Sequence, residues 1–147
     1  MVGSRDIETC RPGGRVSALA SELLAMTVRT KRVYEPPSAE DGYRVLIDRL
    51  WPRGVSKEKA SIDEWARNLA PSDDLRRWFD HRPERFDEFK RRYTDELRDQ
   101  ADHIAALRRR ARTGVVTIVF AASDHDHSNA AVLAPLLRRG FPRMARR

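Results

Sequence analysis

The sequence has a single cysteine, Cys10, and no apolar run long enough to span a membrane. One cysteine excludes an intramolecular disulfide and a cage of thiolate metal ligands, so we expect a reducing, cytoplasmic setting. The chain also lacks a glycine-rich phosphate loop, a nucleophile elbow, a zincin motif and a kinase signature. These absences exclude the enzyme classes that such motifs define, so any chemistry depends on residues that the fold brings together.

The chain does have the size and composition of one soluble globular domain. Its 147 residues are 40% hydrophobic and 35% charged, which allows a sizeable core beneath a heavily charged surface. The net charge is +7, and five arginines near the C-terminus, where no acid occurs, contribute +5 of it. The rest of the chain is therefore close to neutral. These arginines are Arg138, Arg139, Arg143, Arg146 and Arg147.

Breaks in the sequence pattern divide the chain into three segments. Residues 1–25 contain the helix-breaking run Arg11–Gly14 and no convincing signal peptide, so they are predicted to be a poorly ordered leader or an over-called start before Met26. Residues 26–140 are predicted to form the α/β domain. Residues 141–147 are predicted to be a basic tail.

Hydrophobic periodicity predicts a single-domain α/β fold with a small, mostly parallel sheet flanked by helices. The expected strands are 28–34 at an edge, 44–50, and 115–122 at the centre. The expected helices are about 57–69, a short one after the N-cap Ser72, one long helix at about 83–112, and 128–138. Because helices separate the last two strands, we expect these strands to be parallel. If they are adjacent, the loops that follow them meet at one edge of the sheet, where α/β proteins bind ligands.

The loop after the strand at 44–50 carries the first candidate site, made of Asp48, Arg49, Trp51, Arg53 and Gly54. Two arginines suit bidentate capture of a phosphate or carboxylate, the tryptophan can stack on a ring, and the glycine allows close backbone approach. The alternative is structural: the aspartate pairs with an arginine, and the tryptophan fills the core.

The second candidate site lies in the loop Asp124–Asn129, after the central strand. Asp124 and His127 are candidates for general acid or base catalysis, because histidine titrates near neutrality. Asn129 is a candidate ligand-binding residue, whereas Ser128 can instead cap the following helix.

We expect no metal and no cofactor at this second loop. Adjacent residues of one loop rarely all reach a single ion, and no further histidine or cysteine is clearly supplied. His81 and His103 are predicted to be surface or packing residues.

Three blocks of the sequence resemble the domain-of-unknown-function 488 family, and its YeaO-like branch in particular. The blocks are Arg44–Glu58, Leu69–Phe79 and Ala121–Leu133. They occur in the family's order and span about residues 28–139. The resemblance implies a small bacterial cytosolic α/β protein from a family without an assigned activity.

The resemblance also bears on the candidate residues. Several candidate residues match positions of the family's motifs. They are Asp48, Arg49, Trp51, Pro52, Arg53 and Gly54 in the first block, and Asp124, His127 and Asn129 in the last. A longer branch of the family carries a Cys-His pair near the start of the last helix. This chain has Ser128–Asn129 there, so thiol chemistry is not implied, and Ser128 also departs from the asparagine of the YeaO-like branch.

Two main functional hypotheses follow. The first is a pocket in which Arg49 and Arg53 hold a nucleotide or another small phosphorylated metabolite, with an enzyme slightly favoured over a pure binder. The second is a module that binds nucleic acid or an acidic partner through the tail arginines, from Arg138 to Arg147, without reading sequence. A non-catalytic regulatory or scaffold protein is a further alternative. The sequence predicts no oligomeric state.

Overall fold

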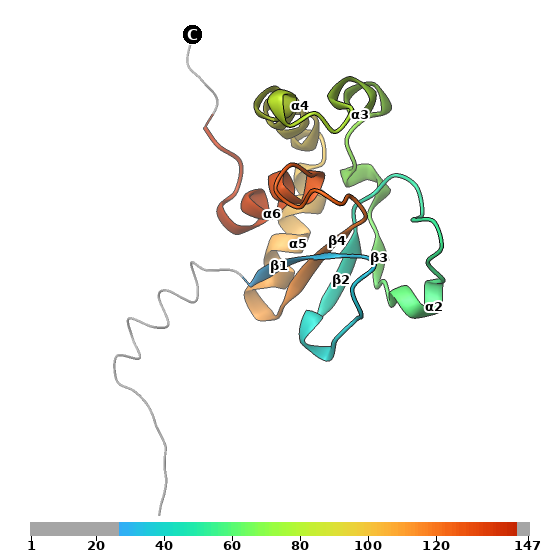
Figure 1. The fold of residues 1–147 in the computed structure, drawn as a ribbon. Coiled ribbons are helices and arrows are strands. Elements are labelled where there is room, and N and C mark those ends of the chain that lie inside the picture. The colour runs from blue at the N-terminus through green and yellow to red at the C-terminus, as the bar shows by residue number, and fades with distance from the viewer. Residues whose placement is uncertain (1–26, 144–147) are drawn as a thin grey trace, which may run out of the picture.

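Four parallel strands form the centre of the fold, in the order β1-β4-β2-β3 (Figure 1). The computed structural model describes residues 27–143, so the predictions for residues 1–25, Cys10, Arg146 and Arg147 lie outside it. The strands are β1 Val28–Arg32, β2 Tyr43–Leu46, β3 Glu64–Trp65 and β4 Val116–Phe120. Every residue of β4 is buried, as expected of the uncharged, β-branched central strand. The predicted parallel pairing of β2 with β4 is confirmed, with Tyr43 opposite Val116.

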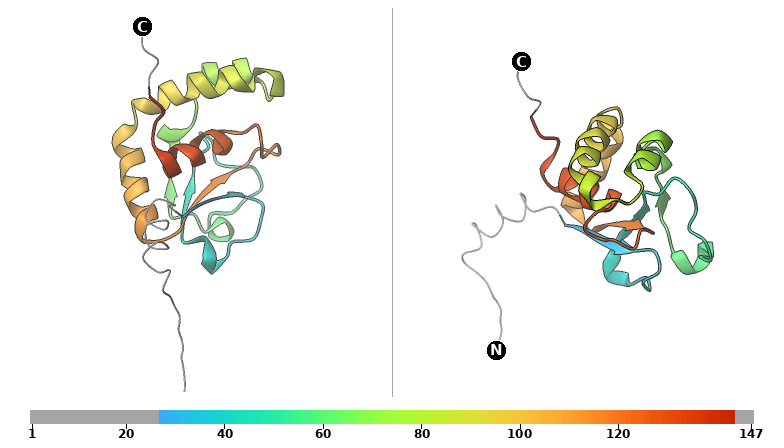
Figure 2. Two further views of the ribbon diagram at one scale, coloured as in Figure 1. Left: turned by 90° about the vertical axis from the view of Figure 1, so that its left-hand side faces the viewer. Right: turned by 45° about the horizontal axis from the view of Figure 1, so that its top comes forward.

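Helices cover one face of this sheet in two layers. They are α3 Asp73–Phe79, α4 Phe86–Arg98, α5 Ala101–Thr113 and α6 Asn129–Arg139, whereas the short helix α2 Lys57–Ala60 lies on the other face. Helices α5 and α6 pack on the strands, and α4 lies over α6 and beside α3 (Figures 1 and 2). The connections on the other face cover a smaller core that includes Leu46, Val119 and Ala60. The predicted N-caps are confirmed, because Ser72 and Ser128 each accept a backbone N–H from the first turn of α3 and α6.

The single long helix predicted over 83–112 is wrong, because the chain turns between α4 and α5. The amide of Gln100 donates to Leu97 O at 2.9 Å, a tightened turn, and the two helices then run in clearly different directions (Figure 2). Leu97 before the turn and Ile104 after it are both buried and keep the spacing of one helical face, so periodicity alone does not reveal the turn. A straight helix of that length would extend about 45 Å. The bend lets α4 pack on α3 while α5 packs on β4.

The helix predicted over 57–69 is also wrong, since it contains a missed strand. Helix α2 ends at Ala60, and its C-cap residue Ser61 has a left-handed φ of 49°. The chain then runs beside β2 as β3. The amide of Ala66 donates to Leu46 O at 2.8 Å. The spacing of Ile62, Trp65 and Leu69 resembles a helical stripe, but Ile62 precedes β3, Trp65 lies on it, and Leu69 lies in the turn that follows.

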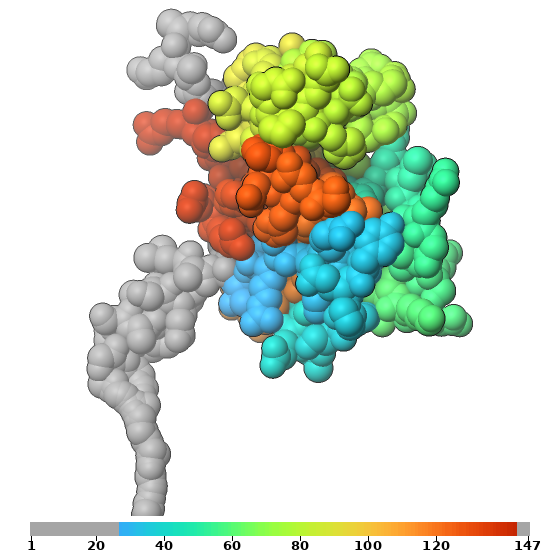
Figure 3. Space-filling view, in the orientation of Figure 1, coloured from blue at the N-terminus to red at the C-terminus, as the bar shows by residue number. Residues whose placement is uncertain are grey.

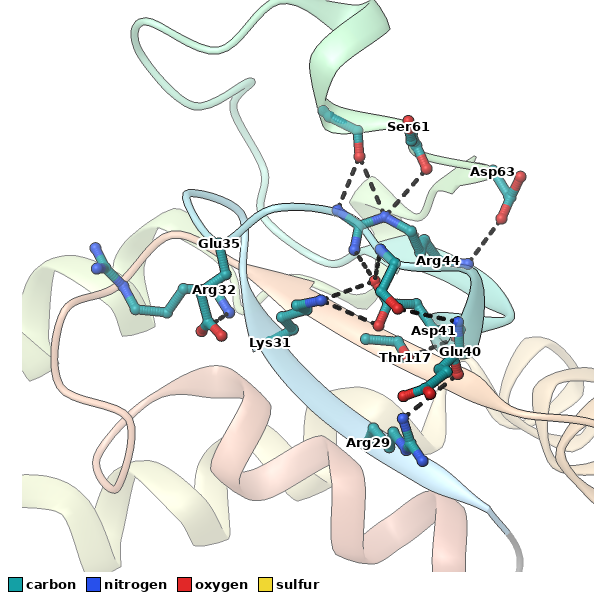
Figure 4. Close-up of polar contacts among 12 residues, drawn as sticks. Arg29, Lys31, Arg32, Glu35, Glu40, Asp41, Arg44, Ser61, Asp63 and Thr117 are labelled. Carbon is teal, nitrogen blue, oxygen red and sulfur yellow. Dashed lines mark hydrogen bonds and ion pairs between the residues drawn. The ribbon is translucent and has the colours of Figure 1, made fainter.

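A buried ionic network ties β1 and β2 to the end of α2 (Figure 4). The Arg44 side chain is 3% exposed; its Nη1 is 2.7 Å from Asp41 Oδ2, and its Nη2 donates to Ala60 O at 2.8 Å. Lys31 Nζ lies 3.1 Å from both Asp41 carboxylate oxygens, and Thr117 Oγ1 donates to Asp41 O. Burial alone would raise the pKa of Asp41, but hydrogen bonds from the Ser38 amide, Lys31 and Arg44 hold it below its usual value.

Candidate functional site

A cavity of about 310 Å³ lies at the carboxyl edge of the sheet, where the loops after β2 and β4 meet α3 and α4. This size is at the lower end of small-molecule sites. The loop after β4 lies at the surface between α4 and the β1–β2 connection (Figure 3). The apolar lining is Leu50, Ala70, Pro71, Phe79, Phe89, Ala121 and Ala122, and the polar lining is Asp48, Arg49, Arg76, His81, His127, Ser128 and Asn129.

Asp48 supplies a largely buried carboxylate to this cavity. Its Oδ2 accepts the Ala121 amide at 3.0 Å and its Oδ1 accepts Asn129 Nδ2 at 3.2 Å. Within residues 27–143 it forms no ion pair, so the structural alternative of an Asp48–arginine pair is wrong. The contact with Asn129 joins the loops after β2 and β4, as the predicted strand adjacency requires. Each carboxylate oxygen retains capacity to accept a further hydrogen bond.

The titration of Asp48 gives a pH-dependent prediction. Burial raises its pKa, although hydrogen bonds from Asn129 and the Ala121 amide oppose the shift. The native state therefore holds the proton more tightly than the unfolded chain, whose aspartates titrate at about 4. Stability should fall as pH rises from that value to the raised pKa, and then level off. We expect the unfolding free energy of wild type, measured relative to Asp48→Asn in denaturant, to decline over this window. A difference that is flat or rises with pH would contradict the burial of this charge.

The two arginines of the cavity share one acidic partner. Asp73 Oδ1, in the first turn of α3, lies 3.2 Å from Arg49 Nε and 3.2 Å from Arg76 Nη2. All three side chains are about half exposed, so water screens these pairs. Two guanidinium groups against one carboxylate leave a net positive charge on one side of the cavity, which suits an anion.

Asp124 and His127 form a base with an orienting partner. His127 Nδ1 lies 2.9 Å from Asp124 Oδ2, and the imidazole packs edge-on against Phe86 with ring centroids 5.2 Å apart. The hydrogen bond from His127 lowers the pKa of Asp124. With Nδ1–H donated to the carboxylate, Nε2 is left as an acceptor. This arrangement can accept a proton from a bound group, or simply hydrogen bond to it.

Trp51, Arg53 and Gly54 lie outside this cavity. Trp51 packs edge-on against Trp65 at 5.4 Å and its Nε1 donates to Val55 O, so it belongs to the smaller core. Arg53 is exposed. Gly54 has φ of 74° and lines a separate hollow beside the β1–β2 connection. The structure therefore brings Asp48, Arg49, His127 and Asn129 together and separates the remainder of the first motif from them.

Sequence reasoning missed several residues of the cavity. Arg76, Phe79 and Phe89 occupy helical positions that indicate packing or solvation, and their role depends on how α3 and α4 sit over the sheet edge. His81, predicted to be a surface or packing residue, follows Asp80, and both are left-handed, with φ of 53° and 51°. Aspartate and histidine tolerate this conformation better than most residues. An Asp-His pair just after a short helix could therefore have indicated a turn that directs the histidine away from the helix.

The described part of the chain offers neither a cluster of metal ligands nor a membrane-spanning helix. Within residues 27–143, no group of three or more His, Cys, Asp and Glu side chains is placed to hold a metal ion. No helix in that range has the length and apolar character needed to cross a membrane.

Together these features define a small α/β protein with a parallel sheet and a cavity at the carboxyl ends of its strands. A profile of the DUF488 family, described as "Inactive DUF488-N3 subclade", matches residues 27–146. The chain belongs to the DUF488 family, and the resemblance seen in its three sequence blocks is confirmed.

Similar proteins occur in mycobacteria and in enterobacteria. The uncharacterised Mycobacterium tuberculosis protein Rv3073c is 49% identical over 110 residues, which cover 75% of this chain and 92% of that protein. The uncharacterised Escherichia coli protein YeaO is 36% identical over 113 residues, which cover 77% of this chain and 98% of YeaO. No solved structure matches the chain.

Proposed function

We propose that this protein binds a small ligand with an apolar or aromatic body and an anionic group, such as a nucleotide or another phosphorylated metabolite. Arg49 and Arg76 would hold the anionic group. Phe79 and Phe89 would pack against the body. A donor group of the ligand would reach the buried carboxylate of Asp48.

The observation that carries this proposal is the placement of Asp48. A desolvated carboxylate without a cation is costly, and such groups concentrate at binding sites rather than in ordinary cores. Here it lines a cavity that also has aromatic walls and two arginines sharing one acidic partner. An amphipathic ligand with separate donor and anionic ends matches this distribution of charge.

Binding without chemistry is favoured over catalysis. Ser128 is 3% exposed, and its hydroxyl donates to His125 O and accepts a hydrogen bond from the Ala131 amide. Because this hydroxyl caps the helix, it is not free to act as a nucleophile. This position lies where a longer branch of the family is expected to carry a cysteine. The matching subclade is described as inactive. Asp124 and His127, our candidates for acid–base catalysis, would then orient or hydrogen bond the ligand.

Thermal unfolding against a ligand panel tests the proposal. The panel contains ribonucleoside 5′-monophosphates, the corresponding nucleosides, sugar phosphates and inorganic phosphate. A ligand that binds only the native state stabilises it by about 2.7 kcal/mol at roughly 100 times its Kd. We expect a monophosphate to raise the melting temperature more than its nucleoside or phosphate alone. The double variant Arg49→Gln/Arg76→Gln should weaken that binding by at least about tenfold, since it removes hydrogen bonds between charged groups.

The matched control is Arg77→Gln/Arg91→Gln, which removes two arginines from exposed ion pairs on α3 and α4. It changes the net charge equally and should bind as wild type does. If no phosphorylated compound shifts the melting temperature, or if both double variants lose binding equally, the pocket does not hold an anionic ligand. The regulatory or scaffold alternative would then be favoured.

A further inference from the structure

Two helices end side by side at the amino edge of the sheet, opposite the cavity. Helix α5 ends just before β4 begins, and α6 runs back from the cavity to the start of β1. Arg108 Nε donates to Leu137 O at 3.1 Å, and Arg138 Nη2 donates to Val28 O at 2.6 Å. The C-terminal turns of α5 and α6 therefore form one continuous corner of the molecule.

This corner carries five arginines, which we call the α5–α6 basic face. No acidic residue occurs between Asp102 and Asp124, or after Asp126. Within residues 27–143, none of the five arginines forms an ion pair, whereas the arginines of α3 and α4 pair with neighbouring acids. The residues of the face are Arg108, Arg109, Arg112, Arg138 and Arg139.

Structural needs account for two of these charges. The C-terminal carbonyls of a helix favour nearby cations, and Arg108 meets this need at Leu137 O in the last turn of α6. Arg138 instead donates to Val28 O and ties the end of α6 to β1. Arg109, Arg112 and Arg139 are exposed. Arg112 lies three residues after Arg109 and four after Arg108, so these side chains are neighbours along α5. The positive charge thus exceeds what the helix ends require.

We infer that the α5–α6 basic face binds the phosphate backbone of duplex DNA. Guanidinium groups suit bidentate contact with phosphate, and a face without acids concentrates the positive field. The large exposed hydrophobic residues in the described part of the chain are Tyr34 and Leu50, and neither lies on this face. Base stacking, which single-strand binders use, is therefore not available there. Contacts to phosphate alone give binding that is independent of sequence and strongly dependent on salt.

Fluorescence anisotropy with the full chain and a labelled DNA duplex tests this inference. We expect binding whose logarithmic slope against salt is roughly −0.9 for each phosphate contacted. The double variant Arg109→Gln/Arg112→Gln should bind at least about tenfold more weakly and reduce that slope by about 2. The control Arg77→Gln/Arg91→Gln should leave both quantities unchanged. A chain ending at Arg143 should retain binding, since Arg146 and Arg147 are not part of the face.

Other outcomes would overturn the inference. These are no binding to the duplex at low salt, equal binding by Arg109→Gln/Arg112→Gln and wild type, or loss of binding only when residues 144–147 are removed. Preference for the single strand, or for vesicles of anionic phospholipid over the duplex, would equally contradict it. The melting temperature of each variant, measured without DNA, shows whether the fold is intact, which we expect because the substituted residues are exposed.

Discussion

Arg44→Met is expected to destabilise the protein by about 3–5 kcal/mol, because removing one partner of a buried ion pair leaves the other charge uncompensated. Asp41 would lose its 2.7 Å contact and keep Lys31, whose side chain is more exposed. The carbonyl oxygen of Ala60 would lose the donors that anchor the end of α2. Chemical denaturation monitored by circular dichroism measures the change.

The matched control is Arg77→Met. Arg77 Nη2 lies 2.7 Å from Asp74 Oδ1, the same separation as in the buried pair, but its side chain is 65% exposed rather than 3%. Exposed pairs contribute about 0–1 kcal/mol. Equal losses for the two variants would mean that the pair of Arg44 with Asp41 is not buried as described.

Gly42→Ala is expected to cost about 3–5 kcal/mol, from backbone strain and from overpacking together. Gly42 has φ of 62° and ψ of −128°, a conformation that side chains disfavour. A Cβ atom there would lie 2.3 Å from Val115 O, which already accepts the Tyr43 amide at 2.9 Å. Because the clash is with backbone, relief requires the β2–β4 pairing to shift.

Gly54→Ala separates strain from packing. Its φ of 74° is also left-handed, but nothing lies within 4 Å of the added methyl. Strain alone should cost about 1–2 kcal/mol. Urea unfolding of both variants compares the cost of strain alone with the cost of strain and overpacking together. A larger loss of unfolding free energy for Gly54→Ala than for Gly42→Ala would contradict the close approach of Gly42 to Val115.

The fold was predictable from sequence where local patterns agree with the tertiary environment. The uncharged run that became β4 and the serine caps of α3 and α6 needed no long-range information. The turn at Gln100 and strand β3, in contrast, could be predicted only with information on long-range contacts. Leu97 and Ile104, both buried, keep helical spacing across the turn. Strand β3 is too short to show alternation, since pairing with β2 defines it.

The candidate site was partly predictable for a topological reason. Parallel, adjacent strands send their exit loops to the same edge, so Asp48 and Asn129 could be expected to meet, and they do. The spacing of residues along a loop does not indicate which of their side chains point toward the cavity. Trp51 turns to the smaller core instead, and Arg76 enters from a helix whose packing the sequence did not show.

The cavity and the basic face lie at opposite edges of one sheet. Helix α6 connects them, since its N-terminal residue Asn129 contacts Asp48 and Arg138, near its C-terminus, contacts Val28. The two proposals rest on separate residues, so each can fail without the other. A loss of DNA binding in Arg109→Gln/Arg112→Gln with unchanged ligand stabilisation would show that independence.

An NMR titration of the isotope-labelled protein with ribonucleoside 5′-monophosphates tests the central proposal most directly. The backbone amide of Ala121 and the side-chain amide of Asn129 both donate to Asp48, so they report on the base of the cavity. We predict saturable shifts of these two resonances and of the Arg76 side chain in the wild type, and no shift of the Ala121 and Asn129 resonances in Arg49→Gln/Arg76→Gln. Resonances that stay fixed, or shifts confined to α5 and the end of α6, would contradict ligand binding at the cavity.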